Sequence, residues 1–261
     1  MIDESLDCSP PSLQTKQLNK ILDICIEGSS LAGFVFSLLQ LFTLGASSSS
    51  FFYVLFVSSV FSYHTLSIVK SVFPRFTVEA GFKEKLFLCG DVHYLTIAAL
   101  FLLTGICPLL YIISYLIIFG VKGISFVIKT LIPMLNNPSL SENPAIDQIE
   151  MLISQPIITL VASFCEILLV IQLLFIALFD FRPLTWICLI TYALWQLAFL
   201  FSTNDGHSRA WTIMATSLRE LAAKNSETYG PQLDSVLDKI GDFGKTTTQW
   251  YPSHDLKIHL Q

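Results

Sequence analysis

The stretch IITLVASFCEILLVIQLLFIALF, residues 157–179, decides the fold of this chain. Its one charged residue is Glu166, and the run is longer than the core of a soluble protein requires. A helix that crosses a bilayer needs about 20 apolar residues at a rise of about 1.5 Å each, which this run supplies. We therefore expect a transmembrane helix here.

Five further apolar windows lie on either side of this run, and together the six segments form three pairs. The breaks within the pairs are short and hold Gly, Pro or Ser residues that suit tight turns, whereas the linkers between pairs are longer and polar. The predicted fold is an all-α integral membrane protein with three hydrophobic helical hairpins, hence four to six membrane helices, followed by C-terminal amphipathic helices. The further windows are residues 31–44, 51–69, 92–103, 107–128 and 184–201.

The whole composition agrees with lipid as the solvent. Hydrophobic residues make up 53% of the 261 positions and charged residues only 13%, with a mean hydropathy of +0.63. The net charge of -5 and the absence of a cluster of Lys and Arg argue against nucleic acid as a partner. The six cysteines have neither disulfide-framework nor zinc spacing.

Two of the segments, 31–44 and 92–103, are short for a spanning helix, at about a dozen apolar residues each. Some arms of the hairpins then span the bilayer while others sit as wedges in one leaflet. An ordinary protein with four membrane passes is the competing interpretation.

The distribution of basic residues predicts the orientation. If the three short turns face the lumen, only Arg182 of the 15 Lys and Arg residues lies on that side. The positive-inside rule then places both termini in the cytosol. No Asn-x-Ser/Thr glycosylation site occurs in the chain, which agrees with a nearly bare lumenal face.

These patterns divide the chain into four regions. We predict a cytosolic N-terminal segment at 1–29, a membrane domain of three hairpins at 30–202, amphipathic interfacial helices at 203–243 and a flexible tail at 244–261. The first region holds acidic residues where a signal peptide would be apolar, so we expect an uncleaved anchor. Its weak amphipathic stripe consists of Leu18, Ile21, Leu22 and Cys25.

Two apolar stripes at helical spacing follow the last hydrophobic segment, with Gly230 and Pro231 between them. We predict that both stripes bind the headgroup boundary of the lipid bilayer while their polar faces stay in water. The alternative is that they pack on each other or on the membrane domain as a small cytosolic cap. The first stripe is Trp211, Met214, Leu218 and Leu221, and the second is Leu233, Val236, Leu237, Ile240 and Phe243.

The charged residue within the central run is a candidate functional group. A charge at the centre of a bilayer costs about 2.5–3.5 kcal/mol on insertion scales. Gln155, Thr159, Ser163 and Glu166 share one helical face, and we interpret them as an intramembrane polar packing stripe. The alternative function is a small transporter or channel subunit that uses Glu166.

An enzyme is the third interpretation, and the sequence favours it least. Asp91, His93 and His64 could supply a base and an orienting group, but no nucleophile motif accompanies them. Helix-start Asp residues are commonly caps. Because the chain also lacks a phosphate loop and a metal-ligand motif, we expect neither catalytic activity nor a cofactor or metal.

Three stretches of the chain resemble one eukaryotic family of membrane proteins. They are Asp91-Val92-His93-Tyr94-Leu95, Cys165-Glu166-Ile167-Leu168-Leu169, and His207-Ser208-Arg209-Ala210-Trp211 with the following Leu218-Arg219. From about Asp91 to Lys224 the chain is similar to the family that includes transmembrane protein thirty-three and the fungal pore-membrane protein of thirty-three kilodaltons, also called tetra-spanning protein. Residues 197–205 depart from that family because they hold no Arg.

The resemblance implies a location and a set of partners. It implies residence in the membrane of the endoplasmic reticulum and in the nuclear envelope, association with reticulon-type membrane proteins, and a role in nuclear pore organisation through a membrane-binding C-terminal region. We therefore expect a non-enzymatic membrane-organising protein that contributes to membrane curvature and tubule shape. A homo-oligomer is left open by the sequence.

Overall fold

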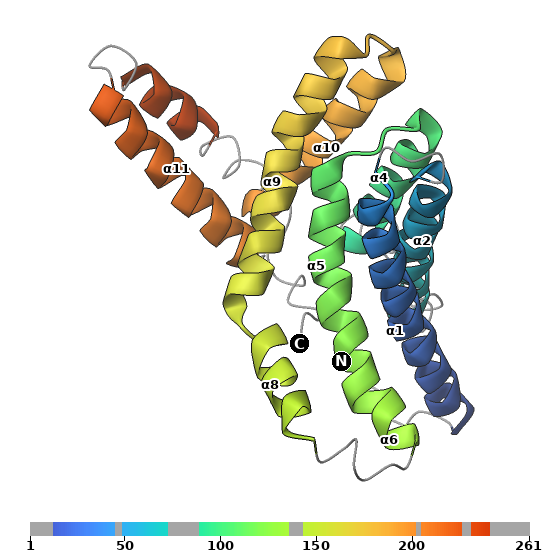
Figure 1. The fold of residues 1–261 in the computed structure, drawn as a ribbon. Helices are drawn as coiled ribbons and strands as arrows, with labels where there is room; N and C mark the ends of the chain where they lie inside the picture. The colour runs from blue at the N-terminus through green and yellow to red at the C-terminus, as the bar shows by residue number, and fades with distance from the viewer. Residues whose placement is uncertain are drawn as a thin grey trace, which may run out of the picture.

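The computed structural model describes residues 13–44, 49–72, 89–135, 143–201, 205–225 and 231–240. Within these residues the protein is entirely helical, as predicted, and residues 231–240 form a last short helix. The labelled elements of Figure 1 are α1 (Leu13–Phe42), α2 (Ser49–Val72), α4 (Gly90–Thr104), α5 (Leu109–Phe126), η2 (Val127–Leu131), α6 (Ile132–Met134), α8 (Pro144–Ile153), α9 (Pro156–Phe179), α10 (Pro183–Phe201) and α11 (Asp205–Asn225).

Four helices of the described part of the chain are long and apolar enough to cross a membrane. α4 is a shorter apolar helix of 15 residues, about 22 Å in length at 1.5 Å per residue. It matches the short segment that the sequence predicts at 92–103. The four candidate spans are Gln17–Phe42, Ser50–Ser71, Leu109–Met134 and Pro156–Phe179.

The prediction of a short first segment at 31–44 is wrong. α1 continues without a break from Leu13 to Phe42, so the predicted N-terminal amphipathic helix and the first apolar segment are one helix. The sequence separates the two parts by charged residues, and charged residues do not end a helix. No Pro lies within α1, so the helix continues. Asp23 pairs with Lys70 of α2 in the structure, so its charge has a partner there.

The helices pack in an order that differs from their pairing along the chain. α1 packs against α2 and α5, and α9 packs against α5. α4 makes more contacts with α2 and with α10 than it makes with α5, which follows it in the sequence. The core between them is rich in aromatic residues: Phe56, Phe101, Tyr111, Tyr115 and Phe119 are fully or almost fully buried. Rings packed edge to face hold the bundle together.

Close contact between α1 and α5 depends on glycine. A Cβ atom added at Gly33 of α1 would lie 2.3 Å from the ring of Phe119, and one at Gly123 of α5 would lie 3.0 Å from the Cα atom of Leu31. Small residues that let two backbones approach are a common basis of helix packing in lipid. The contact therefore fixes the position of α1 on the bundle.

The lower part of α5 changes its helical geometry before a proline. Val127–Leu131 form a π-helical turn, and Pro133 follows in α6. A proline ring clashes with the carbonyl group four residues earlier in a regular α-helix, and a wider turn at this place relieves the clash. The apolar helix therefore extends to Met134, beyond the predicted end at residue 128.

The end of α1 and the start of α2 lie at the same end of the bundle as the α4–α5 and α9–α10 connections, and we call it the turn end (Figure 1). α8 and the start of α1 lie at the opposite end, and α11 projects away from the bundle beside α9 (Figure 1). The chain thus reverses at the turn end in the three places that the sequence predicts.

Candidate functional site

Glu166 lies halfway along α9 and is buried, with 2% of its surface exposed. Its carboxylate accepts a hydrogen bond from the hydroxyl of Tyr94 in α4, at 3.2 Å to each oxygen. Nε2 of His207 in α11 donates to Oε2 over 2.5 Å. The hydroxyl of Tyr192 in α10 donates to the backbone carbonyl of Glu166 over 3.0 Å. Glu166 therefore joins four helices.

The other members of the predicted polar stripe do not join this contact. Ser163 is buried, but its hydroxyl donates to the carbonyl of Thr159 within the same helix. Thr159 in turn donates to the carbonyl of Pro156, and Gln155 is exposed at the N-cap position of α9. Among these four side chains, Glu166 is the one whose hydrogen bonds reach other helices, whereas those of Thr159 and Ser163 stay within α9.

A second buried polar cluster joins α2, α4 and α5. Nδ1 of His64 lies 2.7 Å from Oδ1 of Asp91, and Nε2 of His64 lies 2.8 Å from the hydroxyl of Tyr115. Ser67 donates to the other oxygen of Asp91 over 2.7 Å. A neutral His64 with its proton on Nδ1 satisfies every contact, since it donates to the carboxylate and accepts from the tyrosine.

Tyr94 connects the two clusters. Its ring stacks on that of His64 with 4.9 Å between centroids and 12° between planes, while its hydroxyl reaches Glu166. Trp195 of α10 packs its ring edge to face against Tyr94 at 4.4 Å. We call the joined set of Glu166, His207, Tyr94, His64 and Asp91 the polar network.

The three candidate catalytic residues are only partly brought together. His64 and Asp91 meet, but His93 points elsewhere and stacks on Trp195, with 6.2 Å between ring centroids. The His64 side chain is buried, and the contacts of its ring are with Asp91 and aromatic side chains. No group of three or more His, Cys, Asp or Glu residues within the described parts of the chain has a geometry that could hold a metal ion.

The N-terminal half of α11 docks on α9. Ala210 is fully buried against Ile167, and Trp211 and Met214 pack around this contact with Leu160 and Phe164. Leu218 and Leu221, farther along the same predicted stripe, are exposed. The first stripe is therefore covered by protein at its start and exposed at its end.

The helix at 231–240 lies beside the distal half of α11 (Figure 1). Arg219 of α11 pairs with Asp234 over 3.2 Å and with Asp238 over 2.7 Å. Of the second predicted stripe, Leu237 is buried, Leu233 and Ile240 are half-buried, Val236 is exposed, and Phe243 lies outside the described residues. The packing that the sequence offered as the alternative thus occurs for part of both stripes, and their binding to lipid stays a prediction.

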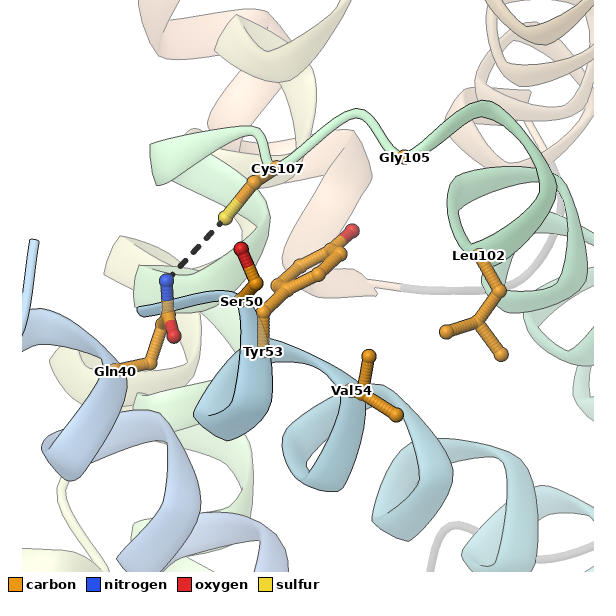
Figure 2. A pocket seen from close by; sticks show the side chains of 7 residues that line it. All are labelled: Gln40, Ser50, Tyr53, Val54, Leu102, Gly105 and Cys107. Carbon is orange, nitrogen blue, oxygen red and sulfur yellow. Dashed lines mark hydrogen bonds between the residues drawn. The ribbon is translucent and has the colours of Figure 1, made fainter. Parts of the chain in front are cut away.

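A pocket of about 220 Å³ opens at the turn end, and none of its lining residues belongs to the polar network (Figure 2). Nε2 of Gln40 points toward the sulfur of Cys107 at 3.6 Å, and the hydroxyl of Tyr53 donates to the carbonyl of Ile106 over 2.5 Å. Desolvation raises the pKa of Cys107 to about 11, although the residue is exposed at the surface. The lining residues are Gln40, Ser50, Tyr53, Val54, Leu102, Gly105 and Cys107.

The connection between α9 and α10 holds its own ion pair. Arg182 donates to both carboxylate oxygens of Asp180, and Thr185 donates to Oδ2. These hydrogen bonds lower the pKa of Asp180 to about 2. The single basic residue of the turn end is therefore neutralised locally.

One amphipathic helix was missed by the sequence analysis. α8 carries Ile146, Ile149 and Ile153 on one face, and its first residues are fixed by Asn143, whose side chain accepts a hydrogen bond from the backbone of Ala145. The signal in the sequence was an Asn-Pro pair at a helix start followed by apolar residues three and four positions apart. Lys129 pairs with Glu150 on its polar side over 3.0 Å.

Comparison with family models, with curated proteins and with solved structures finds no match for this chain. Fold and site define its class: an all-helical protein, over the described residues, with four helices long and apolar enough to cross a membrane and a polar network among its helices.

Proposed function

We propose that the protein is a non-enzymatic organiser of the endoplasmic reticulum membrane and nuclear envelope, which bends the bilayer by inserting shallow helical pairs. The observation that carries this proposal is the short distance along the helices between the turn end and the first charged residues. Asp91, Lys122 and Glu166 each lie 13 residues from the turn end of their helix (104 − 91, 122 − 109 and 179 − 166). At 1.5 Å per residue this is about 20 Å.

Between the turn end and these three residues the uncharged length is therefore shorter than an ordinary hydrocarbon core, which is about 30 Å thick, whereas α2 carries no charged residue before Lys70. Glu27 of α1 lies at a similar level, 15 residues from Phe42 (42 − 27). Where the uncharged length is this short, the protein thins the bilayer around it or sits toward one leaflet. A position toward one leaflet favours a bent membrane, because the protein then occupies unequal areas in the two leaflets.

The amphipathic helices support the same function. α8 and α11 carry exposed apolar residues such as Ile149 and Leu221 beside polar faces. A helix of this kind lies in the headgroup boundary and expands the leaflet that it enters. With the turn end in the lumen and both chain termini in the cytosol, as the basic residues predict, these helices would add area to the cytosolic leaflet.

The three stretches that carry the family resemblance meet in the polar network. Asp91 and Tyr94 belong to the first stretch, Glu166 to the second and His207 to the third. Residues that are far apart in the sequence thus form one contact, which is what a shared fold would require. On this basis we extend the proposal to association with reticulon-type proteins and nuclear pore components.

Reconstitution of the full chain into bilayers of different thickness tests the proposed function. We expect the highest unfolding temperature in thin bilayers, with lipid chains of about 14 carbons, and small or tubular vesicles at high protein content. Preferential stability in bilayers of ordinary thickness, with vesicles that stay large and round, would contradict the proposal. A soluble protein of the same size, enclosed at the same mass, controls for crowding.

The burial of ionisable pairs inside the bundle favours transport as the second candidate function. Glu166 with His207, and Asp91 with His64, could carry protons. Replacement of Glu166 by Gln separates the two functions. Loss of a proton or solute flux into vesicles with unchanged vesicle shape would favour transport, whereas the membrane-organising proposal expects no flux in either protein.

A further inference from the structure

The contact between α11 and α9 combines one buried polar pair with a small apolar patch. His207 and Glu166 have only 5% and 3% of their side chains exposed. His207, Ala210, Trp211 and Met214 follow one another at i, i+3, i+4 and i+7, so they share the face of α11 that meets α9. This face is the beginning of the same stripe that ends in exposed leucines.

The stripe is therefore divided between two environments. Trp211 and Met214 are half-buried against α9, while Leu218 and Leu221 have 38% and 58% of their surface exposed. Figure 1 shows the reason, because α11 diverges from α9 along its length. In the docked position only the distal half of the stripe can enter a lipid surface.

We infer that the pair of His207 and Glu166 is a latch that holds the proximal half of α11 on the bundle and withholds Trp211 and Met214 from the membrane. Opening the latch would make the whole stripe available to the cytosolic leaflet. This inference rests on the proposed function, in which α11 binds that leaflet, and it adds a means of regulating the binding.

The surrounding contacts make opening feasible. When His207 leaves, the carboxylate of Glu166 keeps the hydrogen bond from Tyr94, so it is not left without a partner in the bundle. The apolar patch is small, with Ile167 and Ala210 as its buried residues among those that the structure describes. The hydrogen bond between His207 and Glu166 then contributes a large share of the docking free energy.

The full chain in lipid nanodiscs tests the latch. Replacement of His207 by Phe keeps a ring but removes the donor to Glu166. We expect about tenfold faster hydrogen exchange of the backbone amides at 206–216. We also expect stronger quenching of Trp211 fluorescence by brominated lipids, obtained by subtracting the signal of the same protein with Trp211→Phe. Glu166→Gln, which keeps an acceptor oxygen, should give a smaller change in both.

Asp234→Asn is the matched control, because it breaks an exposed ion pair of α11 and leaves the latch intact. It should leave exchange at 206–216 unchanged. If His207→Phe also leaves exchange unchanged, the latch does not exist. If exchange rises and quenching does not, α11 undocks without binding lipid, and the proposed role of α11 in membrane binding is wrong.

Ala210→Leu, which places bulk at a fully buried position, should open α11 in the same way if His207→Phe fails to fold.

Discussion

Gly33 and Gly28 lie on the same helix but in different surroundings, which makes them a matched pair. A methyl group at Gly33 would meet the ring of Phe119, which is fully buried, whereas one at Gly28 meets nothing within 4 Å. We predict that Gly33→Ala destabilises the protein by about 1–3 kcal/mol through overpacking. Gly28→Ala should stabilise it, by up to about 1 kcal/mol, because alanine favours the helix.

Thermal unfolding of the two variants in the same detergent measures this difference. Equal unfolding temperatures for Gly33→Ala and Gly28→Ala would mean that α1 does not pack on α5 as described. The comparison is independent of any function of the protein.

Asp91 is the second residue whose replacement has a defined effect. Asp91→Leu removes the acceptor for His64 and Ser67 and leaves a buried Nδ1–H without a partner. A buried donor left unsatisfied costs about 1–3 kcal/mol. Asp91→Asn keeps one acceptor oxygen and should lose less, as denaturant titration in detergent would detect. A larger loss for Asn than for Leu would contradict the assigned hydrogen bonds.

At the scale of single helices, α8 offers a test of an element that the sequence analysis missed. Asn143→Ala removes the side chain that caps its first turn and should destabilise this helix by about 1 kcal/mol. Hydrogen exchange at residues 145–149 should then become roughly five times faster, while exchange in α9 stays unchanged. Asn143→Asp, which keeps a capping oxygen, is the control. Equal exchange in Asn143→Ala and the unmodified protein would exclude the cap.

Sequence alone predicts those elements whose signal is local. The apolar run of α9 and the three chain reversals are predicted because length and Gly or Pro content define them. The continuity of α1 was missed because the partner of Asp23, Lys70, comes from another helix. The polar network could be predicted only in part: Glu166 is conspicuous in its run, but its partner His207 lies 41 positions away in a polar segment.

At the scale of the whole molecule, Cys107 reports on the orientation. Its pKa of about 11 means that little thiolate is present at pH 7, so alkylation should be slower than that of a free cysteine, whose pKa is about 8.5. The rate should rise about tenfold per pH unit until the pH approaches this value, because the thiolate is the nucleophile. Mass spectrometry after timed labelling in detergent measures this rate.

In sealed membranes the same cysteine distinguishes the two faces. A reagent that does not cross lipid should modify Cys107 only from the side of the turn end, which the basic residues predict to be lumenal. Labelling from the cytosolic side in intact microsomes would reverse the predicted orientation. Labelling after permeabilisation serves as the control for reactivity.

The shortness of the three chain reversals has a consequence for how the protein is made. Only a few residues separate α1 from α2, α4 from α5 and α9 from α10. If the turn end is the translocated side, as the basic residues predict, the cell has almost no hydrophilic material to translocate during synthesis. In that orientation, an insertase that transfers only short polar stretches would be sufficient for these three reversals.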